Sequence, residues 1–184
     1  MNLRTLIMGA NASFIRAGTS DPDEDPAVLV SATHKPEDDE SELYLSLGVV
    51  ESAVVTPKVE KLRLKAPSPG RYRLRKTIPL SQELEIRMTM QDFSQLAFES
   101  LFQIDGALTV GAAKQPMEQT ESITGWLKLI LADQTDTTTG ELFLWVEISI
   151  NPINVGERQY SYEWVVDVLE NPLATFTLAA LTNN

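Results

Sequence analysis

The stretch PKVEKLRLKAPSPGRYRLRKTIPL, residues 57–80, predicts a long β-hairpin. Leu62 and Leu64 alternate with basic residues, and this period of two is typical of a strand with unlike faces. The sequence PSPG at 67–70 then predicts a turn. After the turn the alternation resumes, with Tyr72 and Leu74 between arginines. The basic positions of the two strands are Lys61, Arg63, Lys65, Arg71, Arg73 and Arg75.

The hairpin concentrates the positive charge of an otherwise acidic chain. Between Lys58 and Lys76 lie eight of the fifteen basic residues and one acid, which leaves seven basic residues and 25 acids elsewhere. The chain of 184 residues has a net charge of -11. Binding to DNA or to an anionic membrane needs cations to neutralise phosphate, so the bulk of the surface opposes both. No apolar run approaches the length of a membrane span.

The segment 19–42 carries the opposite charge. It holds nine acids and one basic residue, Lys35, around a short apolar island at 27–30. We expect a long acidic loop with a short edge strand at the island. A calcium loop starting at Asp21 is disfavoured, because its sixth and twelfth positions are Pro26 and Ala32 rather than Gly and Glu. A weak, nonspecific cation contact stays open, and a solvated acidic loop explains these acids better. The acids expected to contact a neighbouring chain are Asp21, Asp23, Asp25, Asp38, Asp39 and Glu40.

A basic hairpin and an acidic loop in one chain allow copies to bind head to tail. A heterologous contact of this kind closes into a ring or propagates as a filament. Pairing of the two segments within one chain, or a simply solvated strand face, would explain the same charges. A grip on nucleic acid is disfavoured, because only Tyr72 of the hairpin can stack on a base and the rest of the chain repels phosphate.

The remaining sequence predicts a mainly β fold with one flanking helix, a β-sandwich or barrel with long loops and a single domain over 1–184. Every second residue of 84–90 is apolar, which predicts a strand with one apolar face. Residues 122–150 contain two further predicted strands around a turn. The run 142–146 is apolar on both faces, which predicts a central strand or an interface. Helical spacing over 93–104 follows Asp92, which we expect as the N-cap, and Gly106 is expected to end the helix.

No pattern in the chain predicts catalysis, a metal site or a cofactor. Cysteine is absent, which excludes disulfides and thiolate ligands. His34 is the one histidine, and no Ser/His/Asp pattern accompanies it. Glu83 and Glu85 lie two apart on a predicted strand, but the wet face of a sheet explains them better than acid–base chemistry.

Four pieces in order resemble the major tail tube proteins of long-tailed bacteriophages. They are the strand with VTPKVE at 55–60, the basic hairpin, the strand ELEIRMTM at 83–90 and the helix with LAFESL at 96–101. The late segment WVVDVLENPLATFTL, at 164–178, resembles the closing strand of that family. The resemblance covers roughly residues 43–180, and the acidic segment 19–42 has no counterpart in it. Tube proteins of contractile injection systems share the fold and are a close alternative.

The resemblance implies a structural virion protein that forms stacked rings of six copies around a channel for DNA. It implies a location in the virion tail, assembly in the host cytoplasm, and contacts with other copies and with tape measure, baseplate or terminator proteins. Acids facing the channel would repel DNA rather than bind it. The candidates for this lining are Glu83, Glu85, Glu141 and Glu147. The alternative is a β-sandwich binding module, such as a capsid decoration or carbohydrate-binding domain.

Overall fold

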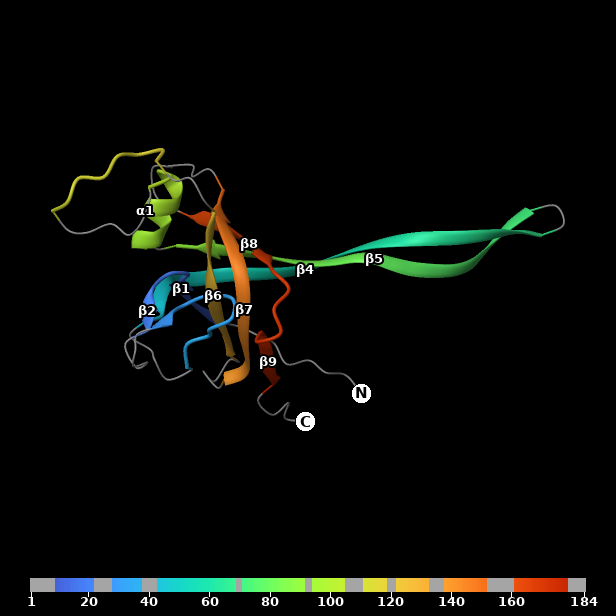
Figure 1. Cartoon of the computed structure of the whole chain (residues 1–184), viewed down its shortest axis with the longest axis horizontal. Coiled ribbons are helices and arrows are strands. Elements are labelled where there is room, and N and C mark those ends of the chain that lie inside the picture. Colours follow the sequence, from blue (N-terminus) through green and yellow to red (C-terminus); the bar gives the residue numbers. More distant parts are fainter. Residues whose placement is uncertain are drawn as a thin grey trace.

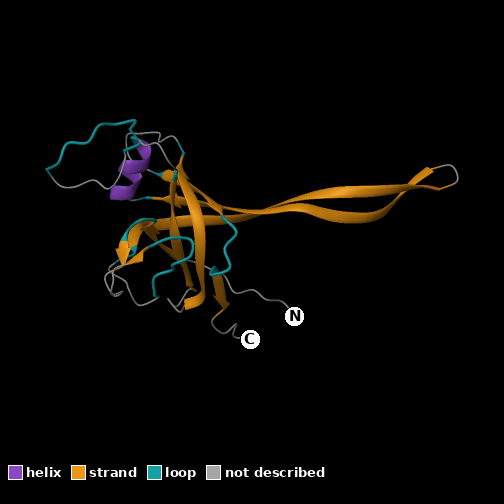
Figure 2. Ribbon diagram, in the orientation of Figure 1, coloured by secondary structure: helices purple, strands orange, loops and turns teal. Residues whose placement is uncertain are grey.

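The computed structural model describes residues 9–21, 28–37, 43–68, 71–91, 94–104, 111–118, 122–132, 138–151 and 161–178. Within these ranges the chain is mainly β with one short helix, as the sequence predicted (Figure 2). The elements are β1 (Gly9–Arg16), β2 (Ser20–Asp21), β3 (Val28–Leu29), β4 (Leu45–Ser68), β5 (Arg71–Met90), α1 (Gln95–Leu101), β6 (Ile123–Ala132), β7 (Thr138–Ile150), β8 (Tyr162–Val168) and β9 (Thr175–Leu178).

The main sheet closes into a small barrel. Its strand order is β6-β1-β4-β5-β8-β7, and β7 pairs back with β6. All of these pairings are antiparallel. β9 continues the edge of β7 where β8 ends, because β8 pairs with 146–150 and β9 with 140–143. A barrel of this size has an interior that side chains fill completely.

The barrel interior is the main core. Inward residues alternate along each strand, so Ile86, Met88 and Met90 of β5 are fully buried, as the apolar row predicted. Phe14 and Trp164 fill the same space from β1 and β8. A polar link also crosses the interior, where the Tyr162 hydroxyl donates to the Leu47 carbonyl oxygen at 3.1 Å.

A second apolar cluster lies on the outer side of the barrel wall. Trp126 and Trp145 pack edge to face, with ring centroids 5.5 Å apart, and the segment 28–37 contributes Val30. Two side-chain hydrogen bonds hold that segment. Trp126 Nε1 donates to the Ser31 carbonyl oxygen, and Asn171 Nδ2 donates to the Ala32 carbonyl oxygen. β7 is therefore paired along both edges and covered on both faces, which confirms the prediction of a central strand at 142–146.

The helix begins later than the sequence predicted. Its N-cap is Ser94, whose hydroxyl accepts from the backbone N–H of Ala97 at 3.2 Å, and not Asp92. Both residue types are good caps, and Ser94 is the one that directly precedes the first helical residue, Gln95. The helix also ends earlier than predicted, at Leu101 with Phe102 as its C-cap, so the predicted end at Gly106 is wrong. Asp92 and Gly106 themselves lie outside the described residues. Leu96 and Ala97 face the barrel core.

The predicted hairpin is the longest feature of the molecule. β4 and β5 pair continuously from the barrel out to Ser68 and Arg71. The barrel strands β1 and β8 accompany only 45–49 of β4 and 84–90 of β5. Residues 58–68 and 71–83 therefore form a two-stranded arm that projects from the barrel (Figure 1). At about 3.4 Å per residue the arm is roughly 35 Å long.

Candidate assembly surface

The arm exposes large apolar side chains along both of its strands. Strand alternation places Leu62 and Leu64 on one face, and Ile78 pairs with Leu62 on that face. Tyr72, near the tip, is 74% exposed. Each such side chain gains about 1.5–3 kcal/mol when it is fully buried, so an uncovered arm leaves favourable burial unused. The exposed large apolar residues of the arm are Val59, Leu62, Leu64, Tyr72, Leu74 and Leu80.

The arm also carries exposed positive charge from its basic residues. Lys61 and Arg63 alternate with Leu62 and Leu64, so they lie on the opposite face. Lys61, Arg63, Lys65 and Arg71 are exposed and form no ion pair with any described residue. Arg73 and Arg75 are part of β5, but their side chains lie outside the described part. A register shift between Leu64 and Lys65 places Lys76 opposite Leu64 and Leu74 opposite Lys65, so apolar and basic side chains occur together on both faces of the arm.

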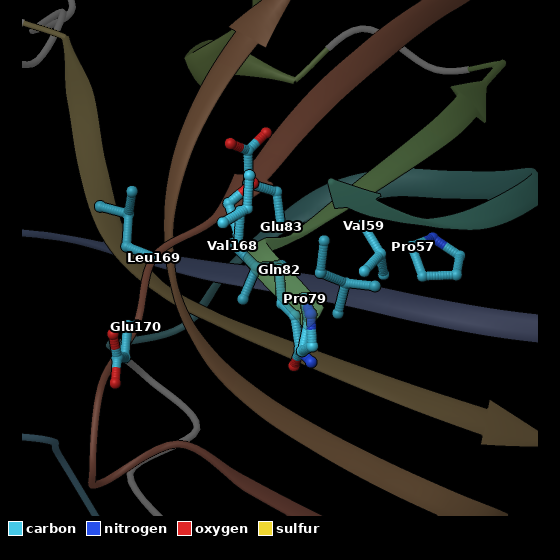
Figure 3. A pocket seen from close by; sticks show the side chains of 11 residues that line it. Pro57, Val59, Pro79, Gln82, Glu83, Val168, Leu169 and Glu170 are labelled. Atoms are coloured by element: carbon cyan, nitrogen blue, oxygen red, sulfur yellow. The ribbon is translucent and has the colours of Figure 1, made fainter. Parts of the chain in front are cut away.

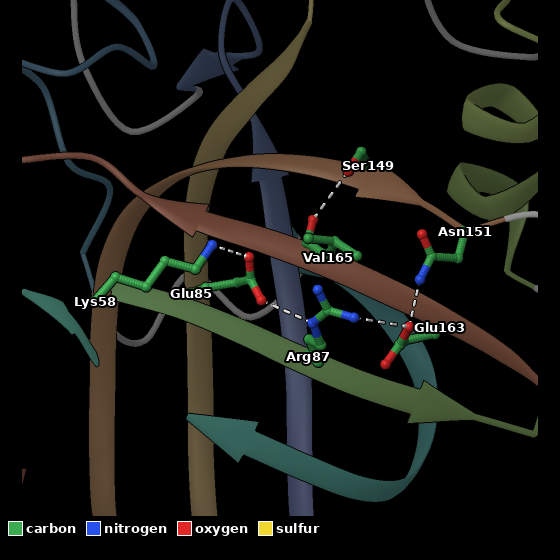
Figure 4. A network of polar contacts seen from close by, with 7 residues as sticks. All are labelled: Lys58, Glu85, Arg87, Ser149, Asn151, Glu163 and Val165. Atoms are coloured by element: carbon green, nitrogen blue, oxygen red, sulfur yellow. Dashed lines mark hydrogen bonds and ion pairs between the residues drawn. The ribbon is translucent and has the colours of Figure 1, made fainter. Parts of the chain in front are cut away.

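A polar network fixes the root of the arm to the barrel (Figure 4). Glu85 is only 7% exposed, and its carboxylate accepts from Lys58 Nζ at 2.5 Å and from Arg87 Nε at 2.7 Å. Arg87 also forms an ion pair with Glu163 of β8, at 3.8 Å, and Glu163 accepts from the side chain of Asn151 after β7. Because Lys58 belongs to β4, the network joins both arm strands to the wall.

The protonation of this network follows from its geometry. The hydrogen bond from Lys58, then that from Arg87, lowers the pKa of Glu85 below its usual value. The hydrogen bond to Glu85 raises the pKa of Lys58, and it does the same for Arg87. All three groups are therefore charged at neutral pH. Charge-assisted hydrogen bonds of this kind are directional, so they set the angle at which the arm leaves the barrel.

An acidic row crosses the outer face of the wall beside this network. In register, Asp167 of β8 stands between Glu85 of β5 and Glu147 of β7. Paired residues share a face, so these three carboxylates lie on one surface. Glu163 of β8 shares that face. The structure therefore brings together two of the predicted lining acids with Asp167 and Glu163, which the sequence analysis missed.

The other two predicted lining acids lie farther out. Glu83 is exposed, two residues beyond Glu85 at the start of the arm. Glu141 is half-buried on β7, where it pairs with Thr177 of β9 rather than with β8. Alternation places each of them on the outer face of its strand. Whether this face lines a channel stays a prediction for all four residues.

The acidic segment is described only in part. Asp21 is 2% exposed and its carboxylate lies 2.9 Å from His34 Nε2, so within one chain it is turned inward. The predicted edge strand at the apolar island is present as β3, paired with β2. The contact residues Asp23, Asp25, Asp38, Asp39 and Glu40 lie outside the described residues, and their role stays a prediction.

A groove lies where the arm leaves the barrel (Figure 3). It has a volume of about 840 Å³, and its walls come from both arm strands and from the end of β8. Pro57, Val59 and Pro79 give it an apolar floor, while Glu83 and Glu170 supply two carboxylates. No basic residue lines it. Sequence reasoning missed the groove, because it depends on where the hairpin separates from the wall.

A smaller apolar patch lies at the other end of the molecule from the arm tip (Figure 1). The ring of Phe98 on α1 stacks with that of Phe102, the C-cap of the helix, with centroids 6.5 Å apart, and the two residues are 44% and 48% exposed. Met117, whose N–H donates to the Phe102 carbonyl oxygen, is 82% exposed. We call these three residues the helix patch.

The described part of the chain contains no group of three or more His, Cys, Asp or Glu side chains that could hold a metal ion. None of its helices is long and apolar enough to cross a membrane.

Comparison with known proteins gives a fold-level result only. No protein-family model and no curated protein matches the chain. Among solved structures, the chain is similar to one from the tail of an empty gene transfer agent particle with C6 symmetry (11% identity, 75% of this chain and 87% of that chain, TM-score 0.43).

A chain from the virion of a native gene transfer agent particle is also similar (12% identity, 74% of this chain and 89% of that chain, TM-score 0.40). So is a chain from the sixfold-symmetrised baseplate of the anti-feeding prophage (6% identity, 96% of this chain and 97% of that chain, TM-score 0.47). Similarity at TM-scores below 0.5 assigns no function to the chain.

Proposed function

We propose that this chain is the structural subunit of a tail tube, which assembles with copies of itself into stacked rings around a channel for DNA. The observation that carries the proposal is the arm. A roughly 35 Å hairpin with exposed apolar side chains and unpaired positive charge has no partner among the described residues of its own chain. Apolar surface of this extent marks an interaction site.

The partner that fits the arm is another copy of an acidic chain. Outside residues 58–76 the chain carries seven basic residues against 25 acids, so any second copy offers negative surface to the arm. Complementary charge speeds the encounter and sets its register, while apolar burial holds the contact. Because the arm and its acceptor are different surfaces, the contact is heterologous and generates rings or filaments. Six copies to a ring follows from the family resemblance.

The acidic outer face supplies the channel lining in this proposal. Asp167 and Glu147 lie in one row with Glu85, and Glu83 and Glu141 lie on the same side of their strands. Because Lys58 and Arg87 neutralise the charge of the buried Glu85, the repulsion falls to the other four acids. Carboxylates along a channel repel phosphate and keep DNA from binding to the wall. The proposal assigns no catalysis and no cofactor. It places the chain in the virion tail after assembly in the host cytoplasm, with tape measure, baseplate or terminator proteins as further partners.

The acidic segment is the proposed acceptor for the basic face of the arm. Its acids at 23–25 and 38–40 would meet the arm of a chain in the next ring. The exposed apolar side chains of the arm need a different acceptor, because the segment 19–42 has only one short apolar island.

A charge reversal on the arm tests the proposal. Arg71→Glu, Arg73→Glu and Arg75→Glu together should abolish assembly, because they turn the end of the arm from positive to negative. These residues lie far from the barrel core, so circular dichroism and thermal melting should show a folded monomer. The matched control replaces the same three residues by Lys, which keeps the charge and should still assemble. Normal tubes from the Glu variant would contradict the proposal.

A second candidate function has one observation in its favour. The stacked Phe98 and Phe102 rings of the helix patch are exposed, and exposed aromatic faces are found in β-rich modules that bind sugars or capsid surfaces. This binding module would stay monomeric when concentrated, and it would bind a saccharide array or a capsid. Phe98→Ala would abolish that binding, whereas it should leave the arm contact of a tube subunit intact.

A further inference from the structure

We propose that the groove at the arm root is the receptor for the arm tip of a second copy of this chain. The inference rests on the proposed function and adds to it the surface that receives the exposed apolar side chains at the arm tip. The groove is open, about 840 Å³ in volume, and lined by proline, valine and leucine side chains with two carboxylates. It therefore matches an occupant that is apolar and positively charged.

The arm tip has this composition. From Lys61 to Lys76 the chain holds seven basic residues and no acid. Tyr72, the most exposed of the arm's large apolar residues, stands beside Arg71 at the end of β5. Tyrosine and arginine are the side chains that most often anchor an interface from a pocket at its centre. The volume accommodates several side chains rather than a strand pair, so we assign Tyr72 to the apolar floor and Arg71 to the carboxylates.

The carboxylates of the groove are available to a partner. Glu83 and Glu170 are both exposed, and neither forms an ion pair with a described residue of its own chain. Glu85, two residues from Glu83, is instead saturated by Lys58 and Arg87. An arginine that enters the groove thus meets two carboxylates and no cation on its lining. Lys58, which stands opposite Glu83 in the strand register, is held by its hydrogen bond to Glu85.

The tip cannot occupy the groove of its own chain. β4 and β5 pair with each other from the root of the arm to its tip. This pairing holds Tyr72 roughly 30 Å from the groove. The occupant is therefore a tip from another copy. Each tip-in-groove contact displaces the next copy along the arm by about the arm length, roughly 35 Å, and the copy that receives a tip still has its own tip free. Propagation follows from this contact alone.

Disulfide capture tests the assignment, because the chain contains no cysteine. Tyr72→Cys is placed in one chain and Gln82→Cys, an exposed position on the groove wall, in a second chain of different mass. The two are mixed under mild oxidation and resolved without reductant. A disulfide requires Cα atoms within about 7 Å, so a mixed dimer reports a tip inside a groove. The matched control pairs Tyr72→Cys with Met117→Cys in the helix patch, which is more exposed than the groove wall.

The mixed dimer of Tyr72→Cys with Gln82→Cys should form at least tenfold more than the Met117→Cys control. Assembled chains with no such excess would overturn the groove assignment and leave the proposed function standing. A predominant cross-link to Met117→Cys would overturn it too, and would identify the helix patch as the receptor. Chains that sediment as monomers and form no cross-link would overturn both the assignment and the tube proposal.

A charge swap gives an independent readout without cysteines. Arg71→Glu and the pair Glu83→Arg with Glu170→Arg should each weaken association measured by sedimentation about tenfold or more. Mixing the two variants should restore it, because opposite charges face each other again. Failure of the mixture to recover, with both variants folded, would overturn the assignment.

Discussion

Gly125 in β6 is predicted to be essential for closing the barrel. A Cβ atom on this residue would lie 2.0 Å from the carbonyl oxygen of Ile15 in β1 and 2.6 Å from the ring of Phe14, where ordinary contact begins at 3.4 Å. In Gly125→Ala the two strands must move apart by more than 1 Å. The pairs next to the clash, Arg16 with Gly125 and Ile15 with Trp126, then lose their ladder hydrogen bonds.

The cost of this substitution can be worked from those losses. Two ladder hydrogen bonds contribute about 1 kcal/mol each, and the buried backbone groups left unpaired cost about 1–3 kcal/mol more. We expect the free energy of unfolding to fall by about 4 kcal/mol. For a chain of this length that lowers the melting temperature by roughly 8–16 °C.

The assay is urea unfolding followed by tryptophan fluorescence, since all three tryptophans are buried. Gly111→Ala is the control. Gly111 has a φ of +83° and no atom near its would-be Cβ, so alanine there incurs only backbone strain, about 1 kcal/mol. Equal losses in the two variants would refute the reasoning, because the clash with β1 would then contribute nothing.

Three further predictions concern the arm root, the helix cap and the acidic segment. Glu85→Gln should destabilise the fold at neutral pH. The folded-state pKa of Glu85 is lowered. The difference in stability between this variant and the unmutated chain should therefore shrink as the pH falls below the usual carboxyl range, and should vanish below the lowered pKa. Urea titrations that show the same difference at every pH would contradict this. Ser94→Ala removes the helix cap and should cost about 1 kcal/mol, and an unchanged melting temperature would contradict that role. Asp38→Lys, Asp39→Lys and Glu40→Lys together should reduce assembly at low salt without unfolding the barrel, and unimpaired assembly would exclude these acids as the acceptor of the basic face.

Local patterns in the sequence were sufficient to predict the elements. The alternation of Leu62 and Leu64 with basic residues predicted the hairpin, and the row of apolar residues along 84–90 predicted the inward face of β5. Both depend on residues two apart, which a strand places on one side by geometry alone. The apolar run at 142–146 similarly predicted a strand covered on both faces.

Features that depend on register could not be predicted. The barrel closes because β6 pairs with both β1 and β7, and such long-range pairing leaves no local trace. Glu85 was expected on a wet sheet face, and the outer face is correct. Its burial, however, depends on Lys58, which is 27 residues away and meets Glu85 only through the pairing of β4 with β5. The N-cap differed because Asp92 and Ser94 are both good caps, and only the path of the chain decides between them.

The structure also separates two roles within the charged residues. Lys58 and Arg87 are bound to Glu85 and orient the arm, whereas Lys61, Arg63 and Arg71 are exposed farther out. Charge reversal should therefore have different results at the two places. Reversal at the root should perturb the fold and the arm direction, and reversal at the tip should perturb association alone.

The central claim, that this chain assembles with itself through the arm, is tested most directly by electron microscopy of the purified protein. Samples concentrated at low and at high salt are stained and compared. The account predicts hollow tubes or stacked rings at low salt that become fewer as the salt screens the charges of the arm. Particles that remain single and monomeric at every salt concentration would contradict it.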